Sequence, residues 1–175
     1  TLQVFLASRY DSFKPEQKVE LSFASQQSIV GDAHLTGNLD LVDIDKKTKH
    51  ITVTDYKTGH PSRDWKGKTD YEKIKLHRYR QQLMFYKLLV EHARDYRGYS
   101  VVRGVLQFVE PTISGDIVSI DDDFSSTEFA DFKKLINSVW NHITTLDLPS
   151  TDQYDQSYKG ILAFEAALIE EAESK

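Results

Sequence analysis

The chain has 175 residues, 39% hydrophobic and 28% charged, which is the size and composition of one globular domain with its own core. It contains no Cys, so disulfides, thiolate zinc sites and cysteine-held iron–sulfur clusters are excluded, and a reducing cytoplasm is the expected location. No apolar run reaches the ~20 residues of a membrane-spanning helix, so no membrane partner is expected. The net charge of −5 gives no overall sign of a nucleic-acid binder.

The first predicted elements are a short helix and three strands. Apolar residues at helical spacing predict a helix over residues 2–13, which Pro15 ends. Alternation of apolar and polar residues then predicts strands over residues 18–23, 34–43 and 50–57. The last two strands are joined by a short polar segment, so we expect them to pair as an antiparallel hairpin.

A long helix and two further strands are predicted next. The sequence Thr69-Asp70-Tyr71-Glu72 is a capping box, and apolar residues at helical period follow it as far as a terminator at Gly98. Residues 101–109 have the pattern of a buried strand, and residues 116–120 that of a shorter neighbour.

The chain ends in two predicted helices. A second capping box, from Ser125 to Glu128, opens a helix with an apolar stripe, and a terminal helix is expected within residues 157–175. The order of elements predicts a central mixed β-sheet flanked by helices, an α/β or α+β domain. We expect a single domain over residues 1–175 with its core at about 18–145.

One segment of this acidic chain is basic. Residues 57–80 contain eight Lys or Arg and three Asp or Glu, a net charge of +5. Such a run is commonly a solvated surface, but its position directly after the motif described next favours a role in gripping phosphates. The candidate DNA-binding cations are Arg63, Lys66, Lys68, Arg78 and Arg80. Trp65, among these cations, is compatible with stacking on a base.

The candidate chemical groups lie on the predicted hairpin. Side chains alternate along a strand, so Asp55 and Lys57 point to the same face. Asp40 lies on the strand that the hairpin brings alongside, and the carbonyl of Tyr56 supplies a further oxygen. Two carboxylates and a carbonyl suit Mg²⁺ or Mn²⁺, hard cations that prefer oxygen ligands. Such a metal activates water and neutralises phosphate charge, while Lys57 stabilises the transition state, so this set suits phosphodiester hydrolysis.

Three motifs in this order resemble those of the PD-(D/E)XK nuclease superfamily. The chain carries Gly37-x-x-Asp40, then Asp55-Tyr56-Lys57-Thr58, and then Gln82-x-x-x-Tyr86 on the predicted helix. The resemblance covers about residues 18–110 and is closest to the RecB-like nuclease domains appended to UvrD/RecB-type DNA helicases. It implies a restriction-endonuclease-like αβββαβ core and a Mg²⁺-dependent deoxyribonuclease, more often an exonuclease, that serves DNA repair or recombination.

The resemblance also implies residue roles. Asp40 and Asp55 would be metal ligands together with the Tyr56 carbonyl, and Lys57 the catalytic lysine. Gln82 and Tyr86 would support the site near DNA, and Glu20 occupies a place where relatives often carry a Glu. RecB-like relatives also carry an upstream His ligand that residues 1–15 do not supply. We therefore expect that the N-terminal part of the parent domain is missing. The implied partners are DNA and the helicase domains of the same parent chain or complex.

Other interpretations of the same residues remain open. Asp55 alone could cap the turn at Thr58, with Lys57 as a solvated strand end. The nuclease fold could also serve as a module that binds DNA or a partner domain after losing its chemistry. A third alternative, an unrelated acidic interaction domain, requires the motif set to be a coincidence.

Overall fold

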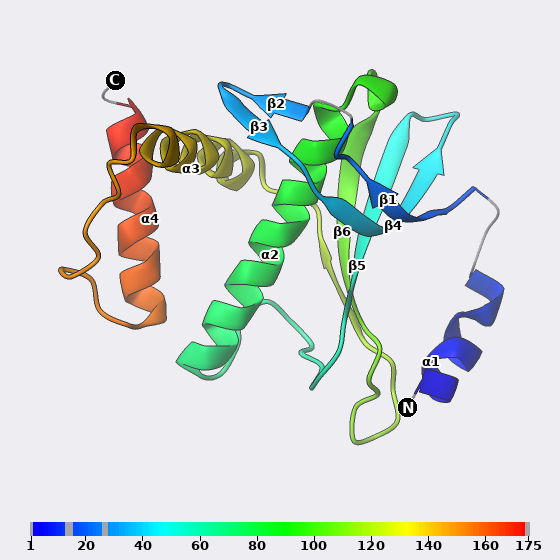
Figure 1. Ribbon diagram of the computed structural model, residues 1–175. Coiled ribbons are helices and arrows are strands. Elements are labelled where there is room, and N and C mark those ends of the chain that lie inside the picture. The colour runs from blue at the N-terminus through cyan, green and yellow to red at the C-terminus, as the bar shows by residue number, and fades with distance from the viewer. Residues whose placement is uncertain (1, 13–15, 26–27, 174–175) are drawn as a thin grey trace.

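The computed structural model describes residues 2–12, 16–25 and 28–173 (Figure 1). Its centre is a five-stranded sheet in the order β1-β4-β5-β6-β7, in which β5 and β6 are parallel and the other neighbours antiparallel. The strands are β1 (Lys18–Ser22), β4 (Asn38–Asp45), β5 (His50–Lys57), β6 (Ser100–Phe108) and β7 (Ser119–Asp122). The predicted central mixed sheet is therefore confirmed.

The hairpin of β4 and β5 forms as the sequence predicts. Its ladder runs from Asp45↔His50 to Leu41↔Thr54. The Asp45 carboxylate accepts hydrogen bonds from the backbone N–H of Lys47, at 2.8 Å, and of Thr48, at 3.3 Å. This side chain closes the turn locally, as Asp commonly does, and so fixes which residues of the two strands face each other.

Helix α2 (Asp70–Glu91) connects the parallel strands β5 and β6 and lies on one face of the sheet (Figure 1). Its predicted capping box is present, because Thr69 accepts from the N–H of Glu72 while the Glu72 carboxylate accepts from the N–H of Thr69. The helix is capped by His92 and so ends before Gly98, the predicted terminator. A short 3₁₀ segment, η2 (Arg94–Tyr96), follows, and Gly98 then turns the chain into β6. Leu83 and Leu88 of α2 are fully buried and anchor the helix to the sheet.

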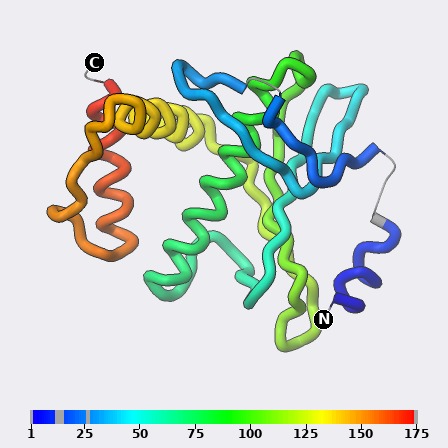
Figure 2. Tube along the Cα trace, in the orientation of Figure 1, coloured from blue at the N-terminus to red at the C-terminus, as the bar shows by residue number. Residues whose placement is uncertain are grey.

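Helices α3 (Ser126–Thr145) and α4 (Tyr158–Glu173) pack together beside α2, whereas α1 (Leu2–Arg9) and its 3₁₀ extension η1 (Tyr10–Ser12) lie at the other side of the sheet (Figure 2). The ring of Phe5 packs edge-on against Tyr56 of β5, with 5.8 Å between ring centroids. None of the helices in the described ranges is long and apolar enough to cross a bilayer.

Two further local predictions are wrong. The predicted strand at 34–43 is two strands, because β3 (Ala33–Leu35) pairs with β2 (Ser28–Val30) in a separate hairpin before β4 begins. The break falls at Gly37, where a Cβ atom would lie 2.8 Å from a methyl of Leu89 on α2. The capping box at Ser125 does not form, since Ser125 makes no side-chain capping bond and the Glu128 carboxylate binds Arg80 instead.

Candidate active site

Asp40 and Asp55 come together at the end of the β4–β5 ladder. Leu41 pairs with Thr54, so one further step of the register sets Asp40 opposite Asp55 on the same face of the sheet. There the ladder is continued by a side chain, because Asp40 Oδ2 accepts the backbone N–H of Tyr56 at 2.9 Å. The hairpin thus delivers two carboxylates to the face that α2 covers.

The Tyr56 carbonyl points towards Asp40. The carbonyl of Lys57 accepts the N–H of Val109, at 3.0 Å, on the β6 side of the strand. Because successive peptide groups of a strand point to opposite sides, the Tyr56 carbonyl is directed to the β4 side, where its own N–H already meets Asp40. The three oxygen donors suggested by the sequence therefore converge at one corner of the sheet.

Asp55 is buried, with 2% of its surface exposed. Its Oδ1 accepts the hydroxyl of Tyr86 at 2.9 Å, and the ammonium of Lys57 lies 2.7 Å from Oδ2. That ion pair lacks the angles of a hydrogen bond, so Oδ2 accepts none from the described residues. Burial raises the pKa of the Asp55 carboxyl, against the opposing effect of Lys57 and Tyr86, and the charge of nearby Asp40 raises it further.

Side chains of helix α2 hold the Lys57 ammonium in place. The Lys57 ammonium donates to Gln82 Oε1 at 2.7 Å, and Gln82 Nε2 donates to the Tyr86 hydroxyl at 2.8 Å. The same ammonium lies 4.5 Å from the centre of the Tyr79 ring, a cation–π contact. Lys57, Gln82, Tyr86 and Asp55 thus form a closed ring of interactions, which holds the ammonium and the carboxylate in fixed positions.

Tyr79 also belongs to this site, although the sequence analysis did not single it out. It lies three residues before Gln82 and therefore on the same helical face, so periodicity is the signal that could have identified it. Burial and the negative charge of Asp55 raise the pKa of both Tyr79 and Tyr86 above the usual value of 10.0. Both phenols consequently stay protonated, and the Tyr86 hydroxyl remains a hydrogen-bond donor.

Glu20 lies on β1, next to this corner. The pairs Val19↔Leu41 and Leu21↔Leu39 set it opposite Asp40, but the ladder skips that position. Glu20 has a φ of 49°, an uncommon conformation for a residue with a side chain, and the side chain is exposed. The structure therefore brings Glu20 to the level of Asp40 without a contact between the two carboxylates.

The cations proposed from the sequence divide into two groups. Arg63, Lys66 and Lys68 are exposed on the loop before α2, and Arg78 is exposed on α2 itself. Arg80 differs, because its guanidinium is held by Asp122, at 2.5 Å, and by both oxygens of Glu128. Since Asp122 is 5% exposed, Arg80 neutralises a buried carboxylate at the junction of α2, β7 and α3. Its donors serve the fold rather than a phosphate.

Trp65 is tied to strand β7 through its indole N–H. Its indole N–H donates to the carbonyl of Asp121 at 2.8 Å, and the ring is partly buried against the core. This contact fastens the loop between β5 and α2 to strand β7. The basic loop is thereby fixed to the sheet beside the site.

The donor set suits a hard divalent cation. Asp55 Oδ2 is a buried carboxylate oxygen whose ion-pair partner is the Lys57 ammonium, and the Asp40 carboxylate and the Tyr56 carbonyl face the same corner. Within the described ranges, no group of three or more His, Asp or Glu side chains is arranged to hold a metal ion. Mg²⁺ commonly keeps several waters beside one or two carboxylates.

Comparison with known proteins identifies one family. The model of the PD-(D/E)XK nuclease superfamily matches residues 2–155, which include every element from α1 to α3 and all the residues of the site. No curated protein matches the chain. The central mixed sheet flanked by helices agrees with the restriction-endonuclease-like fold of that family, with the β2–β3 hairpin inserted between its first and second core strands.

Proposed function

The chain belongs to the PD-(D/E)XK nuclease superfamily, and from that premise we propose that it is a metal-dependent nuclease domain that hydrolyses DNA phosphodiester bonds. The observation that carries the proposal is the coupling of Asp55 and Lys57. A buried carboxylate and an ammonium are costly to desolvate, and here Gln82 and Tyr86 hold both in place. Such fixed charges are expected where they act on a reacting group.

In this proposal Asp40, Asp55 and the Tyr56 carbonyl hold Mg²⁺ or Mn²⁺. When bound, the metal would lower the pKa of a coordinated water and neutralise charge on a phosphate oxygen. Asp40 keeps its orientation through the N–H of Tyr56, and Asp55 through the hydroxyl of Tyr86. These outer contacts fix the two carboxylates before any ligand arrives.

Lys57 provides the positive charge for the phosphate that is cleaved. Gln82 and the Tyr79 ring hold its ammonium, so the side chain loses little further freedom when it meets substrate. Its charge stabilises the negative charge that develops on the phosphate oxygens in the transition state. The exposed cations Arg63, Lys66, Lys68 and Arg78 would bind neighbouring phosphates, which predicts DNA binding that weakens steeply with salt.

The biological setting of the proposal rests on the motif resemblance alone. It suggests an exonuclease rather than an endonuclease, acting in DNA repair or recombination as part of a helicase–nuclease. Circular and linear DNA of the same sequence would separate the two modes. An exonuclease leaves the closed circle intact, whereas an endonuclease cuts both.

A second candidate is a nuclease fold that binds DNA or a partner domain without cutting. The observation that favours it is that Asp40 and Asp55 are joined by no third carboxylate or imidazole within the described residues. A site with only two side-chain ligands binds Mg²⁺ weakly unless the substrate phosphate completes the coordination. The two candidates differ in cleavage, because only the first predicts that the chain cuts DNA.

The deciding experiment is cleavage of end-labelled single- and double-stranded DNA with Mg²⁺ or Mn²⁺. Asp55→Asn and Lys57→Ala are expected to abolish cutting, with the lysine change costing about 100-fold or more. Asp43→Asn is the matched control, since Asp43 lies on the same strand as Asp40 but faces away from the site. Metal-dependent cutting that survives Asp55→Asn refutes the assignment, and DNA binding without cutting supports the second candidate.

A further inference from the structure

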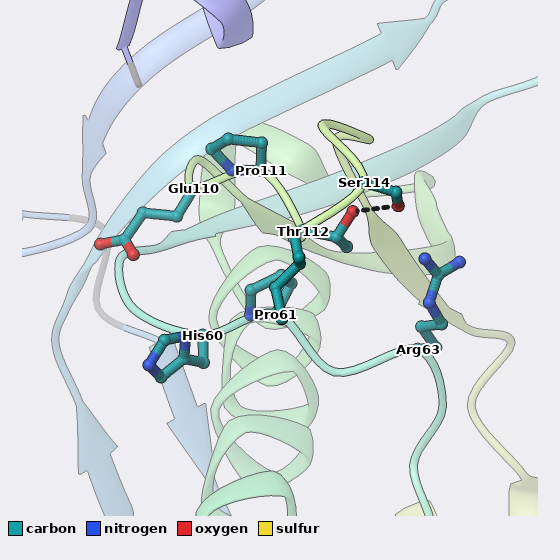
Figure 3. Close-up of a pocket in the computed structure, with 8 residues that line it drawn as sticks. His60, Pro61, Arg63, Glu110, Pro111, Thr112 and Ser114 are labelled. Atoms are coloured by element: carbon teal, nitrogen blue, oxygen red, sulfur yellow. Dashed lines mark hydrogen bonds between the residues drawn. The ribbon is translucent and has the colours of Figure 1, made fainter.

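Beyond the site, two loops line an open groove with a volume of about 710 Å³ (Figure 3). One loop follows β5 and contributes His60, Pro61 and Arg63, and the other connects β6 to β7. In Figure 3 the loops run next to each other, with His60 and Glu110 towards one end and Arg63 and Ser114 towards the other. The volume lies in the range of pockets that accommodate a small organic ligand or a nucleotide.

The groove lies where β5 and β6 end, close to Lys57 along the chain. The carbonyl of Lys57 accepts the N–H of Val109, at 3.0 Å, and Glu110 accepts the N–H of Gly59 at 2.8 Å. The two loops are therefore fastened to each other within two residues of Lys57.

The loop between β6 and β7 is closed by internal hydrogen bonds and carries an exposed apolar side chain at its tip. Thr112 and Asp116 exchange hydrogen bonds, with the Thr112 N–H donating to the Asp116 carbonyl and the Asp116 N–H donating to the Thr112 hydroxyl. Ser114 adds a hydroxyl bond to the Asp116 carboxylate, at 2.7 Å. At the tip between them, Ile113 is 111% exposed, so the loop holds an apolar group fully in solvent.

The lining of the groove has an apolar part and a cationic end. Pro61, Pro111 and Ile113 supply flat or branched apolar surface. Arg63 is 67% exposed, and its one ion pair, to Asp116 at 3.5 Å, is of the exposed kind that contributes little stability. The Glu110 carboxylate at the other end is held by the Gly59 N–H, so a phosphate in the groove meets its cation at Arg63, where it takes the place of the weakly held Asp116 carboxylate.

We propose that this groove is a subsite for one unpaired nucleotide of the substrate strand, adjacent to the phosphate held at Lys57. Its base packs against Pro61, Pro111 and Ile113, and its phosphate faces Arg63. A base in a duplex has both faces covered by its neighbours, so only an unpaired base can meet this apolar surface. The inference rests on the proposed nuclease function and adds to it a preference for a single-stranded segment next to the cleaved bond.

The test uses metal-free binding, so that it does not depend on cleavage. Single-stranded oligonucleotides carrying 2-aminopurine at one position each are titrated with the protein in EDTA, beside duplexes of the same sequence. The fluorescence of 2-aminopurine is quenched by stacking on other bases and increases when a base is withdrawn from the stack. The wild-type chain is expected to increase the fluorescence of single strands and to bind them more tightly than duplexes.

The variants are chosen to leave the fold intact. Ile113→Ala removes only solvent-exposed atoms and is expected to abolish the fluorescence increase and weaken Kd about fivefold. Leu148→Ala, at another exposed apolar residue, is the matched control and should behave as wild type. Arg63→Gln should weaken binding and lower the slope of log Kd against log salt by about one.

The outcomes separate the subsite from the nuclease. If Ile113→Ala binds like wild type, or if duplexes bind as tightly as single strands, the subsite is wrong even where the wild-type chain cuts DNA. If binding depends on Ile113 but no variant or wild-type chain cuts with Mg²⁺ or Mn²⁺, the groove stands as a strand-binding site and the nuclease proposal fails.

Discussion

Replacing Lys57 by methionine removes the ammonium that pairs with Asp55, a carboxylate that is 2% exposed. Methionine keeps the length of the side chain, so the change is chiefly electrostatic. Breaking a buried pair by removing one partner commonly costs about 3–5 kcal/mol, because the remaining charge is left without compensation. Lys57 itself is 16% exposed, so we expect the lower end, about 3 kcal/mol at neutral pH.

The cost should depend on pH in a defined direction. Burial already raises the pKa of the Asp55 carboxyl above its ordinary 3.8, and Lys57 is the main opposing influence, so Lys57→Met raises that pKa further. A raised carboxyl pKa means that the folded state binds a proton more readily than the unfolded chain. Stability is therefore lost as pH rises from 3.8 through the folded pKa, and recovered on acidification.

The assays are urea unfolding and thermal unfolding of Lys57→Met and wild type between about pH 5 and about pH 8, with EDTA present. At the upper limit the melting temperature should fall by about 6–12 °C, the shift that 3 kcal/mol gives in a domain of this size. Adding Asp55→Asn to Lys57→Met removes both charges and should restore stability to within about 1 kcal/mol of wild type. This double variant controls for changes in packing at position 57, because it carries the same methionine without the unpaired carboxylate.

Two results would refute the reasoning. A cost below about 1 kcal/mol at neutral pH would mean that the pair behaves like an exposed one. An equal cost at both ends of the pH range would mean that the loss comes from packing of the methylene groups and not from the stranded carboxylate.

Three further predictions concern residues around the site. Tyr86→Phe removes the hydroxyl that donates to Asp55 and should lower metal-dependent cleavage about tenfold, measured as kcat/KM. Arg80→Met leaves the buried carboxylate of Asp122 unpaired and should cost about 3 kcal/mol in urea unfolding, with an unchanged salt slope of DNA binding. Gly160→Ala, near the start of α4, places a Cβ 1.9 Å from the backbone carbonyl oxygen of Asp155. The free energy of unfolding should therefore fall by about 1–3 kcal/mol, seen as a lower melting temperature. Full cleavage by Tyr86→Phe, a reduced salt slope in Arg80→Met, or an unchanged melting temperature in Gly160→Ala would each contradict the corresponding argument.

The chemistry of the hairpin could be predicted from the sequence because it depends on local periodicity. Alternation along β5 sets Asp55 and Lys57 on one face, and the short polar turn sets Asp40 on the neighbouring strand. The capping box at Thr69 is likewise a relation between residues three apart, and it forms as predicted. Such relations are fixed by the covalent chain and need no knowledge of what packs above.

Relations between distant elements were decided only by the tertiary structure. Arg80 belongs to a basic run in the sequence, but the approach of β7 and α3 brings Asp122 and Glu128 to its guanidinium. That same approach takes Glu128 away from the predicted capping box at Ser125, because a bidentate ion pair competes for one carboxylate.

The site itself divides in the same way. The sequence by itself determined which residues are the candidates for the chemistry, since the pair on β5 and the spacing of Gln82 and Tyr86 are properties of single elements. Only the parallel pairing of β5 and β6, with α2 packed across their shared face, decided that Gln82 and Tyr79 meet the Lys57 ammonium. The physical reason is that burial of the apolar face of α2 fixes its height over the sheet, and no local pattern encodes that position.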